Sequence, residues 1–222
     1  ASPFDLLNTA FMDSGICITI EEGSKIDVPL RMLNITSGVS GTMVSPRVYI
    51  DVEESCSMQL IEQHVGHEGE YFCNQSTIIS IEKNARLDHV IIQNNSRNTI
   101  NMANIHVKQQ KDSNYTFSQF AFGGELSRLN LYAEILGKNA NCSISGLNLS
   151  DGNQHLDSNI VTNHCASQCT SSQNFKSVLK DQSSGVFNGR SIVQINAEKT
   201  DSNQSNKNLL LSDQAIMNSN PQ

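Results

Sequence analysis

Short runs of β-forming residues recur along almost the whole chain, and this recurrence constrains the fold more than any other feature. From Gly15 onward, segments rich in Ile, Val, Thr, Tyr and Phe follow one another with centres about 10–15 residues apart. The clearest alternation lies in residues 128–136, where Leu129, Leu131 and Ile135 share one face of the expected strand. This spacing predicts an all-β fold and leaves two architectures open, a β-helix and a β-sandwich.

Composition favours the β-helix. The chain has no Trp and only 5% aromatic residues, which is little to fill the space between two packed sheets. It has 25 Asn and 29 Ser among its 222 residues. These side chains can stack into hydrogen-bonded ladders at the corners of successive coils. We therefore predict a β-helix and keep the β-sandwich as the alternative.

The chain is expected to form one core domain preceded by a short helix. Ser2 can cap this helix, and Pro3 lies in the first turn, where a missing N–H costs nothing. We assign residues 1–14 to the helical segment and residues 15–222 to the β-helix core. The hydrophobic phase changes within residues 100–107 and again within residues 117–122, which predicts a bulge or a corner at each place.

Charge and hydropathy exclude two classes of partner. The chain has 15 basic and 22 acidic residues, a net charge of −7. Nucleic-acid binders present a basic face, so we expect no nucleic-acid partner. No apolar run approaches the ~18 residues of a membrane span, and no basic segment followed by an apolar run opens the chain. We expect no membrane partner and no leader.

The six cysteines allow two interpretations. An even number could form three disulfides in a secreted protein, and seven Asn-x-Ser/Thr sequons would suit a secreted glycoprotein. However, the Asn, Ser and Thr content alone accounts for roughly four sequons, and a core of this size needs no covalent staples. We interpret the cysteines as mostly buried thiols in a reducing compartment, with a secreted adhesin as an alternative.

Two groups of residues are candidates for a metal site. His164, Cys165 and Cys169 place three soft or borderline metal ligands within six residues. A fourth ligand and a CxxC-type pair are lacking from the sequence, so we assign no metal and interpret these residues as buried thiols and a corner histidine. A weaker group pairs His64 and His67 with two cysteines on neighbouring segments, Cys56 and Cys73.

The sequence contains no recognisable catalytic constellation. It has no Gly-rich phosphate loop and no Gly-x-Ser-x-Gly elbow. The acids Glu134, Asp151 and Asp157 make a β-helix carbohydrate-active enzyme the main enzymatic alternative. Lys176 and Arg190 suit either a partner contact or an ordinary exposed strand face. We therefore predict that the protein is not an enzyme.

An ordered series of short pieces resembles the SufB/SufD family of iron–sulfur cluster assembly proteins, and within it the SufD branch. The pieces occupy residues 123–131 (GGELSRLNL), 154–157 (QHLD), 171–176 (SSQNFK), 185–190 (GVFNGR), 197–201 (AEKTD) and 206–212 (NKNLLLS). Looser agreement extends upstream to residues 7–11 and 84–87. Each piece alone is weak, and the specificity comes from their joint order.

This resemblance implies a right-handed parallel β-helix in a non-catalytic scaffold subunit. It implies SufB-like and SufC-like proteins as partners, the latter an ATPase. The resemblance implies no cofactor bound by this chain itself, and an iron–sulfur cluster associated with the assembled complex. It also implies a bacterial cytosol or, in a eukaryote, a plastid stroma.

The family continues beyond the residues present here. Further strands, a segment bearing Cys and His, and a helical region that docks the ATPase would follow Gln222. We therefore expect this chain to be a SufD-like core truncated at its C-terminal end. On its own it should form a homodimer by strand pairing at the exposed last coil, and it should not bind the ATPase stably.

Overall fold

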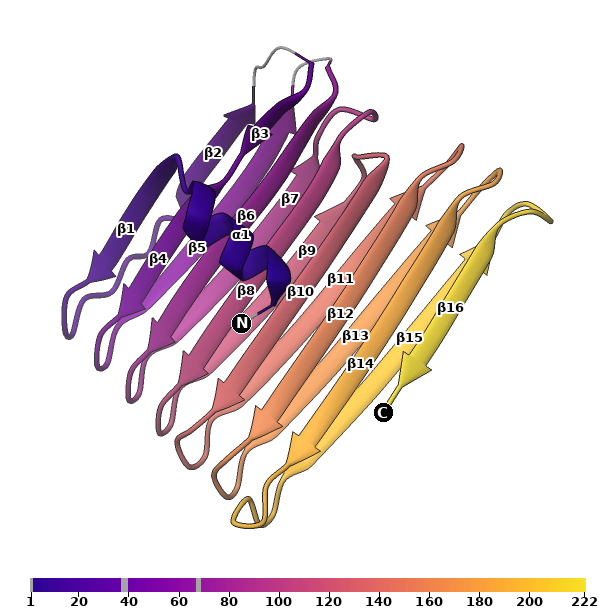
Figure 1. Ribbon diagram of the computed structural model, residues 1–222. Helices are drawn as coiled ribbons and strands as arrows, with labels where there is room; N and C mark the ends of the chain where they lie inside the picture. The colour runs from indigo at the N-terminus through magenta and orange to yellow at the C-terminus, as the bar shows by residue number, and fades with distance from the viewer. Residues whose placement is uncertain (1, 37–39, 67–68) are drawn as a thin grey trace.

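The chain folds into a parallel β-solenoid with a single short helix on one face, as the computed structural model in Figure 1 shows. The structure describes residues 2–36, 40–66 and 69–222. The elements in chain order are α1 (Pro3–Phe11), β1 (Ser14–Ile20), β2 (Leu30–Thr36), β3 (Thr42–Val44), β4 (Pro46–Val52), β5 (Ser57–Gly66), β6 (Tyr71–Ile81), β7 (Arg86–Asn94), β8 (Ile100–Gln109), β9 (Asn114–Ala121), β10 (Leu126–Ile135), β11 (Asn141–Ser150), β12 (His155–His164), β13 (Thr170–Leu179), β14 (Ser184–Val193), β15 (Asp201–Leu210) and β16 (Ile216–Pro221).

From β4 onward, successive strands alternate between two sheets. The first sheet has the order β1-β4-β6-β8-β10-β12-β14-β16, with β3 also paired to β6, and the second has the order β15-β13-β11-β9-β7-β5-β2. From β4 onward each strand pairs in parallel with the strand two places away, as β10 does with β8 and β12. The first three strands pair with the strand three places along the chain. This arrangement confirms the parallel β-helix and excludes the sandwich, in which antiparallel hairpins would dominate.

The corners of successive coils repeat a left-handed backbone conformation. Ser55, Asn84, Asp112 and Asn139 have φ between 57° and 62° and lie 27 to 29 residues apart. The backbone N–H of Asn84 donates to the carbonyl of Lys111 in the next coil at 3.0 Å. Asn and Asp tolerate this conformation better than other non-glycine residues. The corners therefore stack by backbone hydrogen bonds, and their spacing gives the length of one coil.

The hydrophobic core fills the space between the two sheets, because alternate side chains of every strand point inward. The burial pattern of β10 alternates without interruption along its length. The largest buried side chains include Tyr115, Phe117, Phe175 and Phe187. Gly146 makes room for one of them, since a Cβ there would lie 2.3 Å from the Phe175 ring.

Helix α1 confirms the predicted N-terminal helix and lies across the outer face of the first sheet (Figure 1). Its capping box pairs the Ser2 hydroxyl with the Asp5 N–H at 3.2 Å and the Asp5 carboxylate with the Ser2 N–H at 2.8 Å. Asn8 anchors the helix by donating to the carbonyls of Asn74 at 2.7 Å and Pro46 at 3.0 Å. The helix is thus held by polar contacts to the sheet backbone.

Two details differ from the sequence expectations. Strands β8 and β9 keep a continuous register, so the predicted bulges are wrong; the phase changes arise because Ile100 and Phe120 point outward, 42% and 38% exposed. Asn side chains do form a ladder, but its longest run lies in mid-strand on the outer face rather than at the corners. It links Asn74 to Asn104 at 3.2 Å, Asn104 to Asn130 at 3.0 Å, and Asn130 to Asn159 at 3.4 Å.

Candidate functional site

A buried carboxylate lies inside the N-terminal coils and is surrounded by N–H donors. Glu62 on β5 is fully buried. Its Oε1 lies 2.9 Å from His89 Nε2, and its Oε2 lies 3.3 Å from His64 Nε2. The Gln75 amide donates to the same Oε2 at 3.0 Å. A charged group in an apolar core is tolerated only when it is paired in this way.

Strand alternation and the parallel register bring these residues together. Glu62 and His64 are two residues apart on β5, so both point to the interior. His89 occupies an inward position on the next strand of the second sheet, paired in register with Leu60. Gln75 reaches the carboxylate from β6, in the opposite sheet.

The cluster continues to a tyrosine. The Tyr115 hydroxyl lies 3.1 Å from His89 Nδ1, and Tyr115 is fully buried. Burial raises the pKa of Tyr115, with smaller contributions from Cys142 and Glu62, so the phenol keeps its proton. A continuous hydrogen-bonded chain therefore runs from Tyr115 through His89 and Glu62 to His64.

Two opposing effects set the pKa of Glu62. Burial raises it, but hydrogen bonds from His64 and His89 and the charges on these rings lower it, and the net pKa lies below the ordinary value. Glu62 is therefore ionised at neutral pH. Because its folded-state pKa is depressed, the stability it contributes is present above the unfolded value of 4.5 and is lost as the pH falls below it.

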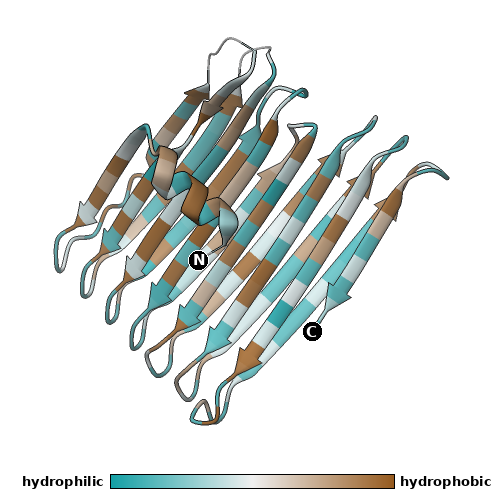
Figure 2. Ribbon diagram, viewed as in Figure 1, coloured by the Kyte–Doolittle hydropathy of each residue, from teal (hydrophilic) through white to brown (hydrophobic). Residues whose placement is uncertain are grey.

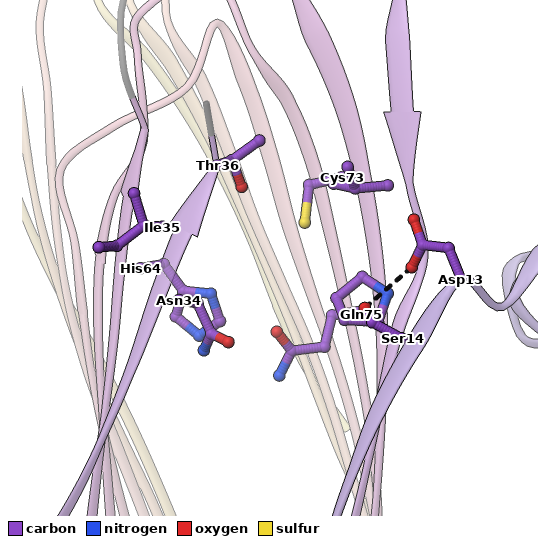
Figure 3. A pocket seen from close by; sticks show the side chains of 10 residues that line it. Asp13, Ser14, Asn34, Ile35, Thr36, His64, Cys73 and Gln75 are labelled. Atoms are coloured by element: carbon purple, nitrogen blue, oxygen red, sulfur yellow. Dashed lines mark hydrogen bonds between the residues drawn. The ribbon is translucent and has the colours of Figure 1, made fainter. Parts of the chain in front are cut away.

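A pocket of about 220 Å³ opens beside this cluster (Figure 3). Figure 3 shows Asn34 and His64 of the second sheet on one side, with Cys73 and Gln75 of the first sheet on the other. Asp13, which precedes β1, contributes a carboxylate to the wall. The pocket therefore joins residues from both sheets at the N-terminal end of the solenoid.

The thiol in this pocket is unreactive. Burial and, to a smaller extent, the nearby negative charge of Asp13 raise the pKa of Cys73 to about 12. The thiolate is the nucleophile and metal ligand, so a thiol that stays protonated at neutral pH is poor in both roles. His64 lies on the pocket wall, and its Nε2 lies 3.3 Å from Glu62 Oε2.

The structure does not bring the first predicted metal-site group together as ligands. His164 points into the solenoid and lies 2.9 Å from the Ser171 hydroxyl, whereas Cys165 is the next residue in the chain and faces the other way. The Cys169 thiol donates to the carbonyl of Gly137 at 3.2 Å. Among the described residues, no three His, Cys, Asp or Glu side chains are grouped closely enough to hold a metal ion.

The second predicted group is only partly described. His64 and Cys73 do line one pocket. Cys56 lies elsewhere and donates to the carbonyl of Glu21 at 2.9 Å. His67 lies outside the described residues. His64 and Cys73 thus line the same polar pocket, but among the described residues they belong to no group that could hold a metal ion.

The acids proposed for a carbohydrate-active enzyme do not converge. Asp151 pairs with Arg97, and Asp157 lies 3.3 Å from Arg128. Burial raises the pKa of Asp157, which its charged neighbours only partly offset. Glu134 is close enough to Cys165 to raise the pKa of that thiol. Two of the three acids are therefore occupied by separate arginines.

The two basic candidates occupy exposed strand positions. Lys176 lies at an exposed position of β13, where alternate residues are buried. The Arg190 guanidinium donates to the Gln222 side chain at 2.9 Å. Both positions suit the exposed-face interpretation, and neither residue lies in the pocket of Figure 3.

All six cysteines are free, and four of them, Cys56, Cys73, Cys142 and Cys169, are buried. This confirms the prediction of mostly buried thiols. No helix in the described part of the chain is long and apolar enough to span a membrane.

The sequence patterns did not identify Glu62, His89 and Gln75 as site residues. The alternation of β5 could have indicated Glu62, because Glu62 and His64 alternate with outward residues on a strand whose other inward positions are Met58 and Leu60. A charged residue at an inward position requires a buried partner. Identifying that partner required the coil register, which places the neighbourhood of residue 62 beside residues 89–91.

These observations define a class of protein, a parallel β-solenoid with a polar cluster buried in its N-terminal coils. Residues 34–222 match the family model described as "SUF system FeS cluster assembly, SufBD core domain". The chain belongs to this family.

Relatives with curated names agree. The chain is 27% identical to the iron–sulfur cluster assembly protein SufD of Escherichia coli over 226 residues, which cover 100% of this chain and 53% of that protein. It is 30% identical to the chloroplastic protein ABCI7 of Arabidopsis thaliana over 92% of this chain and 45% of that protein. The chain thus spans about half the length of these relatives.

Proposed function

We propose that this chain is the core of a non-catalytic scaffold subunit in iron–sulfur cluster assembly, acting in a complex with SufB-like and SufC-like proteins. The observation that carries the proposal is the family match over residues 34–222, together with similarity to SufD along the whole chain. We place the protein in the cytosol of a bacterium or in a plastid stroma. The iron–sulfur cluster belongs to the assembled complex rather than to this chain.

The chemistry of the described residues supports a role without catalysis. The Cys73 thiol is held protonated, and Asp151 and Asp157 each pair with an arginine. The long outer strand faces of the solenoid supply surface for partner contacts, which is how repeat architectures commonly act.

Co-purification tests the proposal. A tagged full-length protein, expressed together with the SufB-like and SufC-like proteins of the same organism, is expected to retain both partners through gel filtration. A parallel sample with the 222-residue chain is expected to lose the SufC-like ATPase. Absence of both partners from the full-length sample would contradict the scaffold assignment, and tight ATPase binding by the 222-residue chain would move the docking surface onto the solenoid.

We also propose that the isolated 222-residue chain self-associates. β15 and β16 are the last strands of their sheets and pair only on one side in the described part of the chain. Unpaired strand edges favour pairing with a second copy. Sedimentation at micromolar concentration is expected to show a dimer, and a monodisperse monomer would contradict this.

A further inference from the structure

The pocket beside His64 contains two buried polar atoms that have no partner. They are the carboxamide oxygen Oε1 of Gln75 and the amide nitrogen Nδ2 of Asn34. Gln75 is only 3% exposed. Leaving a buried polar atom unpaired costs about 1–3 kcal/mol, so such atoms commonly mark a place where another molecule binds.

The orientation of the Gln75 amide is fixed by its neighbours. Its Nε2 donates to Glu62 Oε2 and to Thr77 Oγ1, both at 3.0 Å. Turning the amide over would place its oxygen against the ionised Glu62 carboxylate, which can only accept hydrogen bonds. Oε1 must therefore remain directed away from Glu62 and unpaired within the protein.

The charges around the pocket are negative. Asp13 contributes a carboxylate to the wall, and Glu62 lies directly behind His64 and Gln75. None of the described residues that line the pocket is Lys or Arg. An anion would be repelled here, and a cation would be attracted.

The pocket holds an unpaired acceptor, Gln75 Oε1, and an unpaired donor, Asn34 Nδ2. The Asp13 carboxylate on the wall accepts from the Ser14 hydroxyl and the Ser45 N–H and adds a negative charge. A single metal ion does not satisfy them, because Asp13, His64 and Cys73 are not grouped closely enough to ligate one ion. A ligand with several N–H groups spread over a few ångströms matches this set.

We propose that this pocket binds a small organic cation rich in N–H donors, of the alkylguanidinium class. The cation donates to Gln75 Oε1 and lies close to the Asp13 carboxylate. This ligand site goes beyond the proposed scaffold role, and the scaffold assignment does not depend on it.

Saturation-transfer NMR on the full-length protein tests the site, with methylguanidinium as the probe. We expect saturable binding of methylguanidinium and none of tetramethylammonium, which has the same charge but no N–H group. Acetate is expected not to bind. Equal binding of the two cations, binding of acetate, or absence of methylguanidinium binding would overturn the proposal.

Two variants place the site in this pocket. Asp13→Asn removes one exposed charge and is expected to weaken methylguanidinium binding about fivefold, since a unit charge near a protein surface contributes on this scale. The matched control Asp213→Asn makes the same change in the loop between β15 and β16 and should leave binding unchanged. Gln75→Met removes the acceptor and should abolish binding. If Gln75→Met fails to fold, the comparison of Asp13→Asn with Asp213→Asn still tests the proposal. Equal affinities of these two variants for methylguanidinium would overturn it.

Discussion

The interiors of the N-terminal and C-terminal coils are filled in different ways. Between β4 and β11 the interior is largely apolar, with one charged cluster at Glu62 and neutral polar side chains such as Gln109 and Gln119 elsewhere. Between β12 and β15 large apolar side chains such as Phe175 and Phe187 share the interior with a connected set of Ser, Thr and Gln side chains. Figure 2 shows the same trend, with hydrophobic bands along β4 to β10 and paler or hydrophilic ones along β13 to β16.

The C-terminal interior is held by neutral hydrogen bonds. The Ser171 hydroxyl lies 2.9 Å from both His164 Nε2 and the Ser202 hydroxyl, and Ser202 donates to Ser191 at 2.8 Å. Gln173 donates to Thr162 at 3.1 Å. Two atoms of this network, His164 Nδ1 and Gln173 Oε1, are buried without partners. Burial lowers the pKa of His164, so this ring is neutral at pH 7.

The difference shows that one solenoid can stabilise its coils in two ways. The N-terminal interior relies on apolar burial and one charged cluster, in which loss of any partner exposes an ion to a low-dielectric core. The C-terminal interior relies on many weak bonds, each of which contributes about 1 kcal/mol. Equivalent substitutions should therefore have unequal effects in the two regions.

Two buried histidines give the largest expected contrast. His89 and His164 are 1% and 0% exposed. His89→Leu removes the partner of Glu62 Oε1 inside the core and is expected to lower the free energy of unfolding by about 3–5 kcal/mol. His164→Leu loses one neutral hydrogen bond and removes an unpaired atom, so we expect a loss below about 1.5 kcal/mol. Urea unfolding at pH 7 measures the free energy of unfolding of both variants. Equal losses of stability would contradict the difference between the two regions.

Acid sensitivity should depend on the N-terminal cluster. Because the folded-state pKa of Glu62 is depressed, its contribution to stability is lost as the pH falls below 4.5. Glu62→Gln is expected to flatten this decline while lowering stability at pH 7 by about 2 kcal/mol. Thermal melts from pH 3 to pH 7 provide the measurement. An unchanged slope in the variant would show that other groups cause the acid sensitivity.

The buried acid of β12 should behave in the opposite sense. The pKa of Asp157 is raised in the folded state, mainly by burial. Its contribution is therefore full below the unfolded value of 3.8 and is lost as the pH rises through the folded-state pKa. Asp157→Asn should stabilise the protein at pH 7 by less than about 1 kcal/mol and should have no benefit at pH 3. A destabilised variant at pH 7 would mean that the Arg128 pair outweighs burial.

Cysteine alkylation is expected to show the smallest effect of burial in the two interiors. All six should react when denatured, unreduced protein is alkylated. In the native protein, exposed Cys17 should be labelled first and half-buried Cys165 next, while Cys73 and Cys142 should be protected by burial and a pKa of about 12. Mass spectrometry reads the sites. Two or more stable disulfides would support a secreted protein instead.

The sequence predicted the fold better than the site. Alternation in segments such as residues 128–136 predicted strands, the Asn and Ser content favoured a β-helix over a sandwich, and the family resemblance implied parallel coils. Ser2 and Pro3 predicted the N-terminal helix. The cluster at Glu62 was not predicted, because its partners lie 13 and 27 residues away along the chain. Only the coil length, visible in the left-handed corners at Asn84 and Asp112, would have placed them together.

We propose that this solenoid serves iron–sulfur cluster assembly through protein contacts. The most direct measurement is the cluster content of a reporter iron–sulfur enzyme in cells that lack the gene. We expect low loading without the gene and full loading when it is returned, either intact or as the His164→Leu, Cys165→Ala, Cys169→Ala variant. Unchanged loading without the gene would contradict the role in assembly. Failure of a folded, partner-bound variant to restore loading would contradict the claim that the chain acts through contacts alone.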